Sequence, residues 1–470
     1  MEIHIDLTGT RGHRDAIYRQ LRAAILAGRI RPGEALPPTR ELAQRLAVSR
    51  TTVSAAYDRL TAEGFLAGRV GAGTFVTASP AEHPSPAPDG AGVRPLPEWD
   101  AVPPPPAPFA PAPEFDFRPG VPDLSRFPFD TWRRLVTQRL RAGQADLMTY
   151  GDPQGHAALR AEIARHVGVS RDVRASAAQV VVTAGAQQTT DLVARVLLRA
   201  GDLAAVEDPG YPPPRLVLGA RGVRVAPVPV DESGIVVDAI PAGTRLVYVT
   251  PSHQYPLGLS MSLDRRLELL DWAERTDAVL VEDDYDTEFR YTGRPLEPLH
   301  SLDSRGRVVY VGSFSKVLSP ALRLGFLIAP PSLVPALVKA RYLTDWHAPN
   351  VEQAALAAFM AEGGFARHVR RMRKVYRARH EILTRSLAAF GDFLTPLPSS
   401  AGLHLSAVAA SDCGPLVHAA RRRGVRLYSL GDFGVGERRH GLVFGYGAVA
   451  TERIEPGLAR LRALADEGAA

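Results

Sequence analysis

The sequence predicts an α/β protein made of two folded parts, and three observations support this. Residues 1–78 carry helical hydrophobic patterns followed by a glycine-rich hairpin. Residues 79–114 are roughly a third proline, a composition that prevents regular helix or sheet and predicts an extended spacer. Residues 115–470 alternate short apolar runs with amphipathic helices, which indicates a mainly parallel sheet followed by a smaller C-terminal lobe.

Three helices are predicted before the spacer. An apolar stripe from Ile17 to Ile25 predicts the first, and Gly28 ends it. Thr39 and Ser49 are expected to cap the second and third helices, because a hydroxyl oxygen there can accept a free backbone N–H.

A hairpin is predicted after the third helix. Its two short strands are Phe65–Leu66 and Thr74–Val76, with Gly68, Gly71 and Gly73 between them. Three helices and a glycine-tipped hairpin together predict a winged helix-turn-helix.

The first 78 residues also have a charge suited to nucleic acid. They hold eleven arginines and no lysine against seven acids, so their net charge is 11 − 7 = +4 of the chain's +6. The third helix would present its N-terminus to the major groove, and the hairpin tip would lie against the minor groove. The DNA-contacting candidates are Arg40, Ser49, Arg50, Thr51, Thr52, Arg69, Gly71 and Gly73. The alternative is a helical protein-interaction domain.

The amino-acid composition indicates the cellular compartment of the protein. The single cysteine, Cys413, excludes an internal disulfide and fits a reducing environment. The first residues form no apolar leader, and no stretch reaches the roughly 18 apolar residues of a membrane helix. We therefore expect a cytoplasmic protein.

Five apolar runs predict buried strands in the second part. They are Val180–Val182, Leu203–Val206, Leu246–Val249, Val279–Val281 and Val308–Val311. Ligands of such sheets bind at the carboxyl ends of the strands, so the residues after each run are the site candidates.

The last of these runs opens into a turn that carries a lysine. The turn holds Ser313, Ser315 and Lys316, and Arg323 follows seven residues later. A lysine held in this way can form a Schiff base, while Ser313 and Arg323 can bind a phosphate group. This combination suits pyridoxal phosphate.

An acidic strand end supports the same cofactor. Asp283 and Tyr285 alternate with Asp284, so they share one face of the extended chain. An acid can pair with the pyridine nitrogen of pyridoxal phosphate, and a tyrosine can bond the ring phenolate. Alone, such a cluster is more often a metal site or a solvated face.

Two further turns follow predicted strands. Gly185, Ala186 and Gln187 open a helix whose free amides could bind phosphate. Tyr211 follows the next strand and could stack on the pyridine ring. Each is also compatible with an ordinary strand-to-helix turn.

Several strings resemble known families. Pro37–Ala43, Val48–Val53 and Tyr57–Leu60 are similar to a GntR-type winged helix over about residues 13–77. Residues 115–465 resemble fold type I aminotransferases. The combination resembles the MocR-type regulators most closely, through the strings Thr250–Gly258, Glu282–Tyr291 and Arg367–Arg373.

The resemblance implies a role for each candidate residue. Lys316 would carry the cofactor, Asp283 would pair with its ring nitrogen, Tyr285 would meet the phenolate, and Tyr211 would stack. Tyr150 would reach the phosphate of a partner subunit, which implies a homodimer. The phosphate cup would comprise Gly185, Ala186, Gln187, Ser313 and Arg323, with Ser315 beside it.

Two departures limit this transfer of roles. Type I enzymes usually place asparagine directly before a proline near the phenolate, whereas this chain has Tyr255, so His253 or Gln254 could take that role. The enzymes also bind the substrate carboxylate with a C-terminal arginine. The matching strand here has none, and Arg438 or Arg439 could serve instead.

The sequence thus predicts a pyridoxal phosphate-dependent, DNA-binding regulator. Its ligand would be the cofactor itself or an amino compound bound through a Schiff base. The alternative is a catalytic aminotransferase with a DNA-binding head; a DNA-binding protein with an inert body conflicts with Lys316 and Asp283. The basic run Arg367–Arg379 carries an apolar helical stripe, so we expect its arginines on a solvated face.

Overall fold

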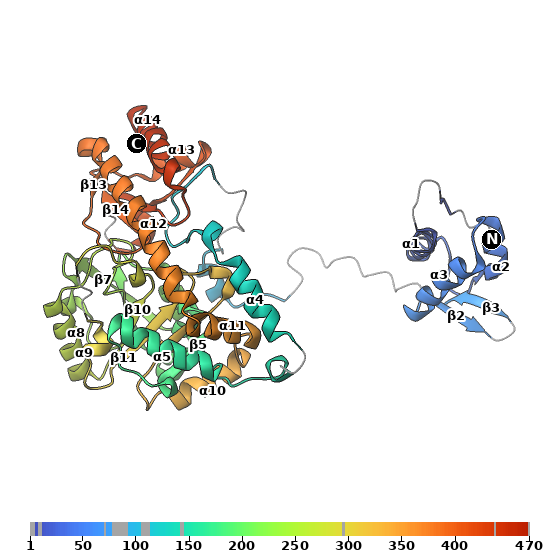
Figure 1. Cartoon of the computed structure of the whole chain (residues 1–470), viewed down its shortest axis with the longest axis horizontal. Helices are drawn as coiled ribbons and strands as arrows, with labels where there is room; N and C mark the ends of the chain where they lie inside the picture. Colours follow the sequence, from blue (N-terminus) through green and yellow to red (C-terminus); the bar gives the residue numbers. More distant parts are fainter. Residues whose placement is uncertain are drawn as a thin grey trace. The chain divides into compact units, whose positions relative to one another are not determined.

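A computed structural model describes residues 5–7, 12–69, 72–77, 93–104, 113–141, 145–293, 297–436 and 439–468. Internal contacts divide the chain into two units, Met1–Pro97 and Glu98–Ala470 (Figure 1). The division falls inside the predicted spacer, and the boundaries 1–78, 79–114 and 115–470 stay a proposal. No helix among the described residues is long and apolar enough to span a membrane.

The first unit has three helices and a small antiparallel sheet. The helices are α1 (His13–Leu26), α2 (Thr39–Arg45) and α3 (Arg50–Ala62). The strands are β1 (Ala35–Leu36), β2 (Leu66–Arg69) and β3 (Gly73–Val76), in the order β1-β3-β2. The predicted winged helix-turn-helix is confirmed, although β1 was not predicted because two residues carry no periodic pattern.

One of the two predicted helix caps is present. The Ser49 side chain accepts the Thr52 N–H at 3.1 Å, so it caps α3 as expected. The prediction for Thr39 is wrong: α2 begins at Thr39 itself, and Pro38 takes the cap position without a side-chain bond. Pro38 has the extended conformation that precedes a helix, so its fixed φ starts the helix one residue earlier.

Removing the Ser49 hydroxyl is expected to loosen the first turn of α3. In Ser49→Ala, the Thr52 amide loses its side-chain acceptor and keeps only the Ser49 carbonyl, which costs about 1 kcal/mol and speeds its local hydrogen exchange about fivefold. Hydrogen exchange of the full chain, followed by mass spectrometry, measures the exchange rate of this turn. Ser54→Ala, in the middle of the same helix, should leave the exchange of that turn unchanged. Equal exchange in Ser49→Ala and wild type would contradict the capping role.

The second unit is built on a sheet of eight strands in the order β5-β12-β11-β10-β9-β6-β7-β8. The strands β5 (Val180–Thr183), β6 (Leu203–Asp208), β9 (Thr244–Val249), β10 (Val279–Asp284) and β11 (Val308–Ser313) match the five predicted runs. The strands β7 (Arg224–Asp231), β8 (Gly234–Ile235) and β12 (Gly325–Ile328) complete it. Neighbours from β7 to β11 are parallel, whereas β12 runs antiparallel to both β11 and β5.

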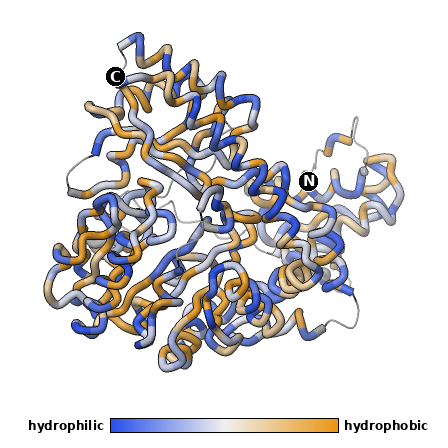
Figure 2. The backbone as a smooth tube through the Cα atoms, turned by 60° about the vertical axis from the view of Figure 1, so that its left-hand side comes forward, coloured by the Kyte–Doolittle hydropathy of each residue, from blue (hydrophilic) through white to orange (hydrophobic). Residues whose placement is uncertain are grey.

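Helices cover this sheet and connect its strands (Figure 1). They are α4 (Phe129–Arg139), α5 (Ala157–Arg171), α6 (Ala186–Leu197), α7 (Pro212–Ala220), α8 (Leu263–Thr276), α9 (Leu299–Leu302), α10 (Val334–Asp345) and α11 (Asn350–Ala361). Orange and blue segments alternate along them in Figure 2, as expected of amphipathic helices beside a buried sheet.

A smaller lobe follows the long helix α12 (Gly364–Leu387). Its sheet has the order β13-β14-β17-β16, from Thr395–Pro396, His404–Val408, Gly441–Gly445 and Tyr428–Ser429. Two helices, α13 (Gly414–Arg422) and α14 (Ile454–Asp466), complete it. The strand β4 (Phe115–Asp116) pairs in parallel with β15 (Val425–Arg426), so the chain leaving the spacer is bound to this lobe.

The basic face of α12 differs from the prediction at one residue. Phe365, Val369, Met372 and Tyr376 are buried as expected, but Arg379 is also buried. Its guanidinium bonds the Asp123 carboxylate at 2.6 Å and the Gly447 carbonyl at 2.6 Å. The cause is position: Arg379 lies three residues after Tyr376 and therefore on the same face of the helix.

Candidate functional site

The carboxyl ends of β10 and β11 border a cavity of about 420 Å³. Ten of the predicted site residues line it: Gly185, Ala186, Gln187, Tyr211, Asp283, Tyr285, Ser313, Ser315, Lys316 and Arg323. They come from five separate strand ends and turns, so the sheet topology brings them together. This position agrees with the general placement of ligands in parallel sheets.

Lys316 projects into the cavity beside a backbone carbonyl. Its Nζ donates to the Gly120 oxygen at 2.9 Å. Burial lowers the pKa of Lys316, Asp286 and Asp283 act against that shift, and Arg323 adds to it. A lowered pKa increases the share of neutral amine, which is the form that attacks a carbonyl carbon.

Asp283 faces the same cavity with one oxygen unpaired. Its Oδ2 accepts the hydroxyl of Tyr248, and its Oδ1 is buried with no hydrogen-bond partner among the described residues. Burial, together with the nearby Asp284, raises the pKa of Asp283 to about 7, although Tyr248 and Lys316 act in the opposite direction. A buried acceptor without a donor is costly, so this oxygen suits a ligand that brings an N–H group.

The neighbouring carboxylates have other partners, as strand alternation requires. Asp284 accepts from Arg171 Nε and from the Tyr310 hydroxyl, each at 2.6 Å. Glu282 accepts the backbone N–H groups at the start of α9. Both residues therefore position β10, while only Asp283 and Tyr285 reach the cavity.

Opposite these acids lies a set of phosphate-compatible donors. Gly185 precedes α6 with φ +109°, a conformation that favours glycine, and the first amides of the helix follow it. Ser313, Ser315 and Arg323 contribute hydroxyl and guanidinium groups to the same cavity. A helix N-terminus with hydroxyls and an arginine can bind a phosphate dianion.

Aromatic rings form the remaining wall. Tyr211 and Tyr255 meet edge to face with centroids 5.5 Å apart, and Tyr285 lies 6.1 Å from Tyr255. The Tyr285 hydroxyl donates to the His253 carbonyl at 2.8 Å. Burial, followed by the nearby Asp283, raises the pKa of Tyr211 to about 12, so its hydroxyl stays protonated.

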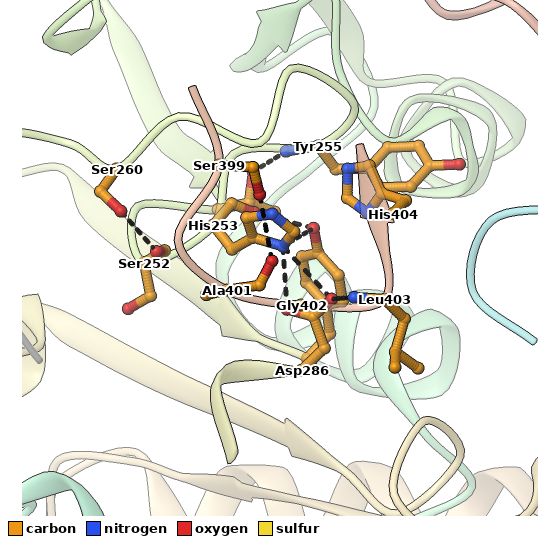
Figure 3. Close-up of polar contacts among 12 residues, drawn as sticks. Ser252, His253, Tyr255, Ser260, Asp286, Ser399, Ala401, Gly402, Leu403 and His404 are labelled. Carbon is orange, nitrogen blue, oxygen red and sulfur yellow. Dashed lines mark hydrogen bonds and ion pairs between the residues drawn. The ribbon is translucent and has the colours of Figure 1, made fainter. Parts of the chain in front are cut away.

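His253 and Gln254 lie behind the cavity wall instead of lining it. The His253 Nδ1 is 3.1 Å from an Asp286 carboxylate oxygen, and His404 lies beside the ring with centroids 4.5 Å apart (Figure 3). The ligand atoms of these three residues lie within 4.8 Å of one another, close enough for a metal. Asp286 also bonds the backbone of Leu403, and His404 bonds that of Pro256. We therefore assign these three residues the role of positioning the chain segments around them.

Gln254 has a structural role in its loop. Its amide Nε2 donates to the Pro209 carbonyl at 2.9 Å and to Glu207 at 3.2 Å, and its oxygen accepts from Leu257. These bonds hold the turn that carries Tyr255 into the cavity. The role expected for His253 or Gln254 at the ring phenolate therefore has no direct support from their position.

Two other predicted residues, Tyr150 and Arg439, do not line the cavity of this chain. Tyr150 is 74% exposed and stacks on Trp346 with centroids 4.4 Å apart, so it is available to a neighbouring subunit. Arg439 donates to the Val230 carbonyl at 2.6 Å. Arg438 lies outside the described residues.

In the first unit, the N-terminus of α3 presents the predicted DNA contacts. Arg40, Arg50 and Thr51 are exposed, whereas Ser49 and Thr52 are joined by the capping bonds. Arg69 lies over the Phe75 ring, 4.8 Å from its centroid, and Gly73 starts β3. Gly71 lies outside the described residues.

Eight residues that line the cavity were not among the predicted site residues: Arg118, Pro119, Gly120, Val121, Ala184, Tyr255, Pro320 and Tyr428. Ala184 and Pro320 lie in turns that hold predicted residues, and Tyr248, which bonds Asp283 from behind the cavity, is the next-to-last residue of the neighbouring strand. These three could have been found. The others reach the cavity from the chain after the spacer, from a loop and from the C-terminal lobe, and no local pattern marks them.

Comparisons with known proteins agree with both units. Residues 120–429 match the family model described as aminotransferase class I and II, and residues 13–76 match bacterial regulatory proteins of the gntR family. The chain is 38% identical to the "Probable rhizopine catabolism regulatory protein MocR" of Rhizobium meliloti, over 95% of this chain and 92% of that protein. It is 35% identical to the "HTH-type pyridoxine biosynthesis transcriptional regulator PdxR" of Corynebacterium glutamicum, over 92% and 91% of the two chains.

A solved enzyme structure is similar to the second unit. LysN, an alpha-aminoadipate aminotransferase of Thermus thermophilus complexed with N-(5'-phosphopyridoxyl)-L-leucine, superposes with a TM-score of 0.69 and 29% identity. The match covers 75% of this chain and 92% of the enzyme.

Proposed function

The chain belongs to the MocR-type regulators, which join a gntR-type head to an aminotransferase class I and II body, and from this premise we propose that Lys316 is its ligand sensor. Pyridoxal phosphate is the cofactor, and the head makes the protein a DNA-binding transcriptional regulator. In the proposal, the body captures pyridoxal phosphate or an amino compound at Lys316. That event changes the affinity of the head for its operator.

One observation carries the proposal: the Lys316 amine and the unpaired Oδ1 of Asp283 share one cavity. When bound, pyridoxal phosphate supplies an aldehyde that condenses with amines and a ring that withdraws electrons. Lys316 would offer the amine, and Asp283 would hold a proton on the ring nitrogen. Tyr211 would stack on the ring, and the phosphate would be held by Gly185, Ala186, Gln187, Ser313, Ser315 and Arg323.

Sensing fits this cavity better than rapid transamination. Aminotransferases need a cation for the substrate carboxylate, and Arg323 is assigned to the phosphate. Arg118 is the other arginine lining the cavity, and its guanidinium is paired with Asp116, Nε to Oδ1 2.7 Å. The names of two relatives, in pyridoxine biosynthesis and rhizopine catabolism, support the cofactor and amino compounds as ligand classes.

The test is whether ligand binding to the body changes the affinity of the head for DNA. Purified protein would first select a duplex from a random-sequence DNA pool, and its affinity for that duplex would be measured by fluorescence anisotropy. Adding pyridoxal phosphate, with or without candidate amines, should change the affinity of wild type and leave that of Lys316→Ala unchanged. An affinity indifferent to the cofactor in wild type would contradict the sensor role.

Arg50→Ala is expected to weaken binding to the selected duplex by about 1–3 kcal/mol, because Arg50 is exposed at the first turn of α3. The measurement is the same anisotropy titration, repeated over a range of salt concentrations. Arg29→Ala removes the same charge from an exposed turn away from α3 and serves as the control. Retained affinity and salt dependence in Arg50→Ala would contradict the placement of the recognition helix.

A homodimer is part of the proposal, with Tyr150 acting on the partner's phosphate. The support is a group of exposed apolar side chains around Tyr150: Met148 at 71%, Tyr342 at 47% and Leu343 at 77% exposure. Such groups mark interaction surfaces in soluble proteins. Since the proposed partner is DNA, we also propose a cytoplasmic location.

Leu343→Glu is expected to dissociate this dimer, because it buries a charge at the proposed interface. Sedimentation velocity at micromolar concentration should show the mass fall to half. Val169→Glu is the matched control, since Val169 is 85% exposed on a different helix. An unchanged mass in Leu343→Glu, or an equal loss in Val169→Glu, would exclude this surface as the dimer interface.

A further inference from the structure

A groove lies on the second unit, apart from the cofactor cavity. Two adjoining hollows of about 480 Å³ and 580 Å³ share Thr292, His380, Thr384 and Ser399. Their walls come from the loop at Gly258, the segment after β10, helix α12 and the segment before β14. None of their lining residues lines the cofactor cavity.

The groove contains a guanidinium without an anion. Arg290 is half-buried, its Nε is buried without a partner, and no hydrogen bond or ion pair involves its side chain among the described residues. Arg377 and Arg385 also line the groove, but Arg377 donates to the Tyr291 carbonyl and Arg385 lies 3.9 Å from the Glu455 carboxylate. Because a poorly solvated cation is unfavourable unless it is paired, Arg290 suits an anionic ligand.

Two imidazole nitrogens indicate a second property of the ligand. The Nε2 atoms of His253 and His380 are both buried, and neither has a hydrogen-bond partner in the part of the chain that the structure describes. His253 is only 2% exposed, and its Nε2 points to the groove wall: a Cβ on Gly258 would lie 3.3 Å from it and 3.5 Å from the Ser399 hydroxyl (Figure 3). Since the Nδ1 of His253 donates to Asp286, its Nε2 in the neutral ring is an acceptor.

We propose that this groove binds a small oxyanion that also carries an O–H group, such as hydrogen phosphate. Arg290 pairs with the anionic oxygens, and the hydroxyls of Thr292 and Thr384 lie within the same recess. The Nε2 of His380, which lines both hollows, accepts the ligand's O–H, whereas His253 lies behind the wall at Gly258. Burial lowers the pKa of His380, which keeps that ring neutral and able to accept.

A single residue, His253, separates the proposed site from the cofactor cavity. Its carbonyl accepts the hydroxyl of Tyr285, and Tyr285 lines that cavity. The groove is therefore a second ligand site, beyond the sensor function of Lys316. Its binding can be measured whether or not that function is correct.

Isothermal titration calorimetry of the protein saturated with pyridoxal phosphate tests the proposal, because the cofactor then fills its own phosphate cup. Inorganic phosphate should bind saturably at one site per chain. It should bind more tightly than sulfate at equal ionic strength, since sulfate carries no O–H at neutral pH. Absence of saturable binding at millimolar phosphate, or equal affinity for the two anions, would overturn the proposal.

Three variants locate the site. Arg290→Gln should weaken phosphate binding by at least about tenfold, the usual effect of losing a charge-assisted hydrogen bond. Thr384→Leu fills the shared part of the groove from an exposed helical position and should also block binding without loss of folding. Arg370→Gln, exposed on the same helix outside the groove, should bind as wild type does. Unchanged binding in Thr384→Leu, or equal weakening in Arg370→Gln, would place the anion elsewhere.

Discussion

Replacing Lys316 by alanine is expected to abolish covalent retention of pyridoxal phosphate and the visible absorbance band that accompanies it. The reason is that, among the described side chains that line the cavity, Lys316 alone carries an amine. Absorbance of the purified protein after removal of free cofactor measures the band. Lys339→Ala removes an exposed lysine from α10 and should leave the spectrum unchanged.

The chain's composition makes the site of attachment easy to establish. Its lysines are Lys316, Lys339 and Lys374, so borohydride reduction followed by peptide mass mapping must assign the label to one of three positions. We expect the label on the peptide containing Lys316. A label on Lys339 or Lys374, or a band that survives in Lys316→Ala, would refute the assignment.

Asp283→Asn is expected to weaken pyridoxal phosphate binding by about 2–5 kcal/mol, the range for losing one partner of a buried charged hydrogen bond. Its Oδ1 is the acceptor that the ring nitrogen needs, and an amide there is a weaker acceptor. Equilibrium dialysis or cofactor fluorescence measures the affinity. Asp130→Asn, with a 92% exposed side chain on α4, is the control and should bind normally.

The same variant should have the opposite effect on the cofactor-free protein. In the folded chain the pKa of Asp283 is about 7, above its usual value of 3.8, so the folded state binds more protons than the unfolded state between these values. The contribution of Asp283 to stability therefore falls as pH rises through this window and is lowest above about 7. Urea unfolding at pH 8 should thus show cofactor-free Asp283→Asn to be more stable than wild type, with the difference shrinking towards pH 4. If the variant is less stable than wild type at pH 8, the unpaired carboxylate of Asp283 does not destabilise the folded, cofactor-free protein.

The residues that the sequence predicted at the cavity share one property: each lies at the end of a strand or in the turn that follows it. Asp283, Tyr285 and Ser313 are found by reading where an apolar run ends, because a parallel sheet brings such ends to one edge. Gly120 and Tyr428 come instead from the chain after the spacer and from β16. Their approach depends on how the lobe packs against the sheet, and no local pattern encodes that.

Arg379 and β12 illustrate two other limits. Arg379 continues the buried stripe of α12, but its charge argued for solvent, and only the distant partner Asp123 makes burial favourable. The strand β12 begins two residues after Arg323 and runs back along β11 between it and β5. A run of only four residues does not indicate whether a strand runs parallel or antiparallel to its neighbours. The antiparallel strand between β11 and β5 could therefore not be predicted.

The pairing of β4 with β15 has a mechanical consequence. It clamps the spacer's exit to the C-terminal lobe at Phe115 and Asp116, and Gly120, which accepts the Lys316 ammonium, is only four residues further on. Fully stretched, that segment is about 14 Å long, so it has little slack. Any chemistry that took the lysine nitrogen away from Gly120 would break a hydrogen bond within four residues of the point where the spacer joins the lobe. The nitrogen that reacts and the end of the spacer are therefore connected through one short segment of the chain.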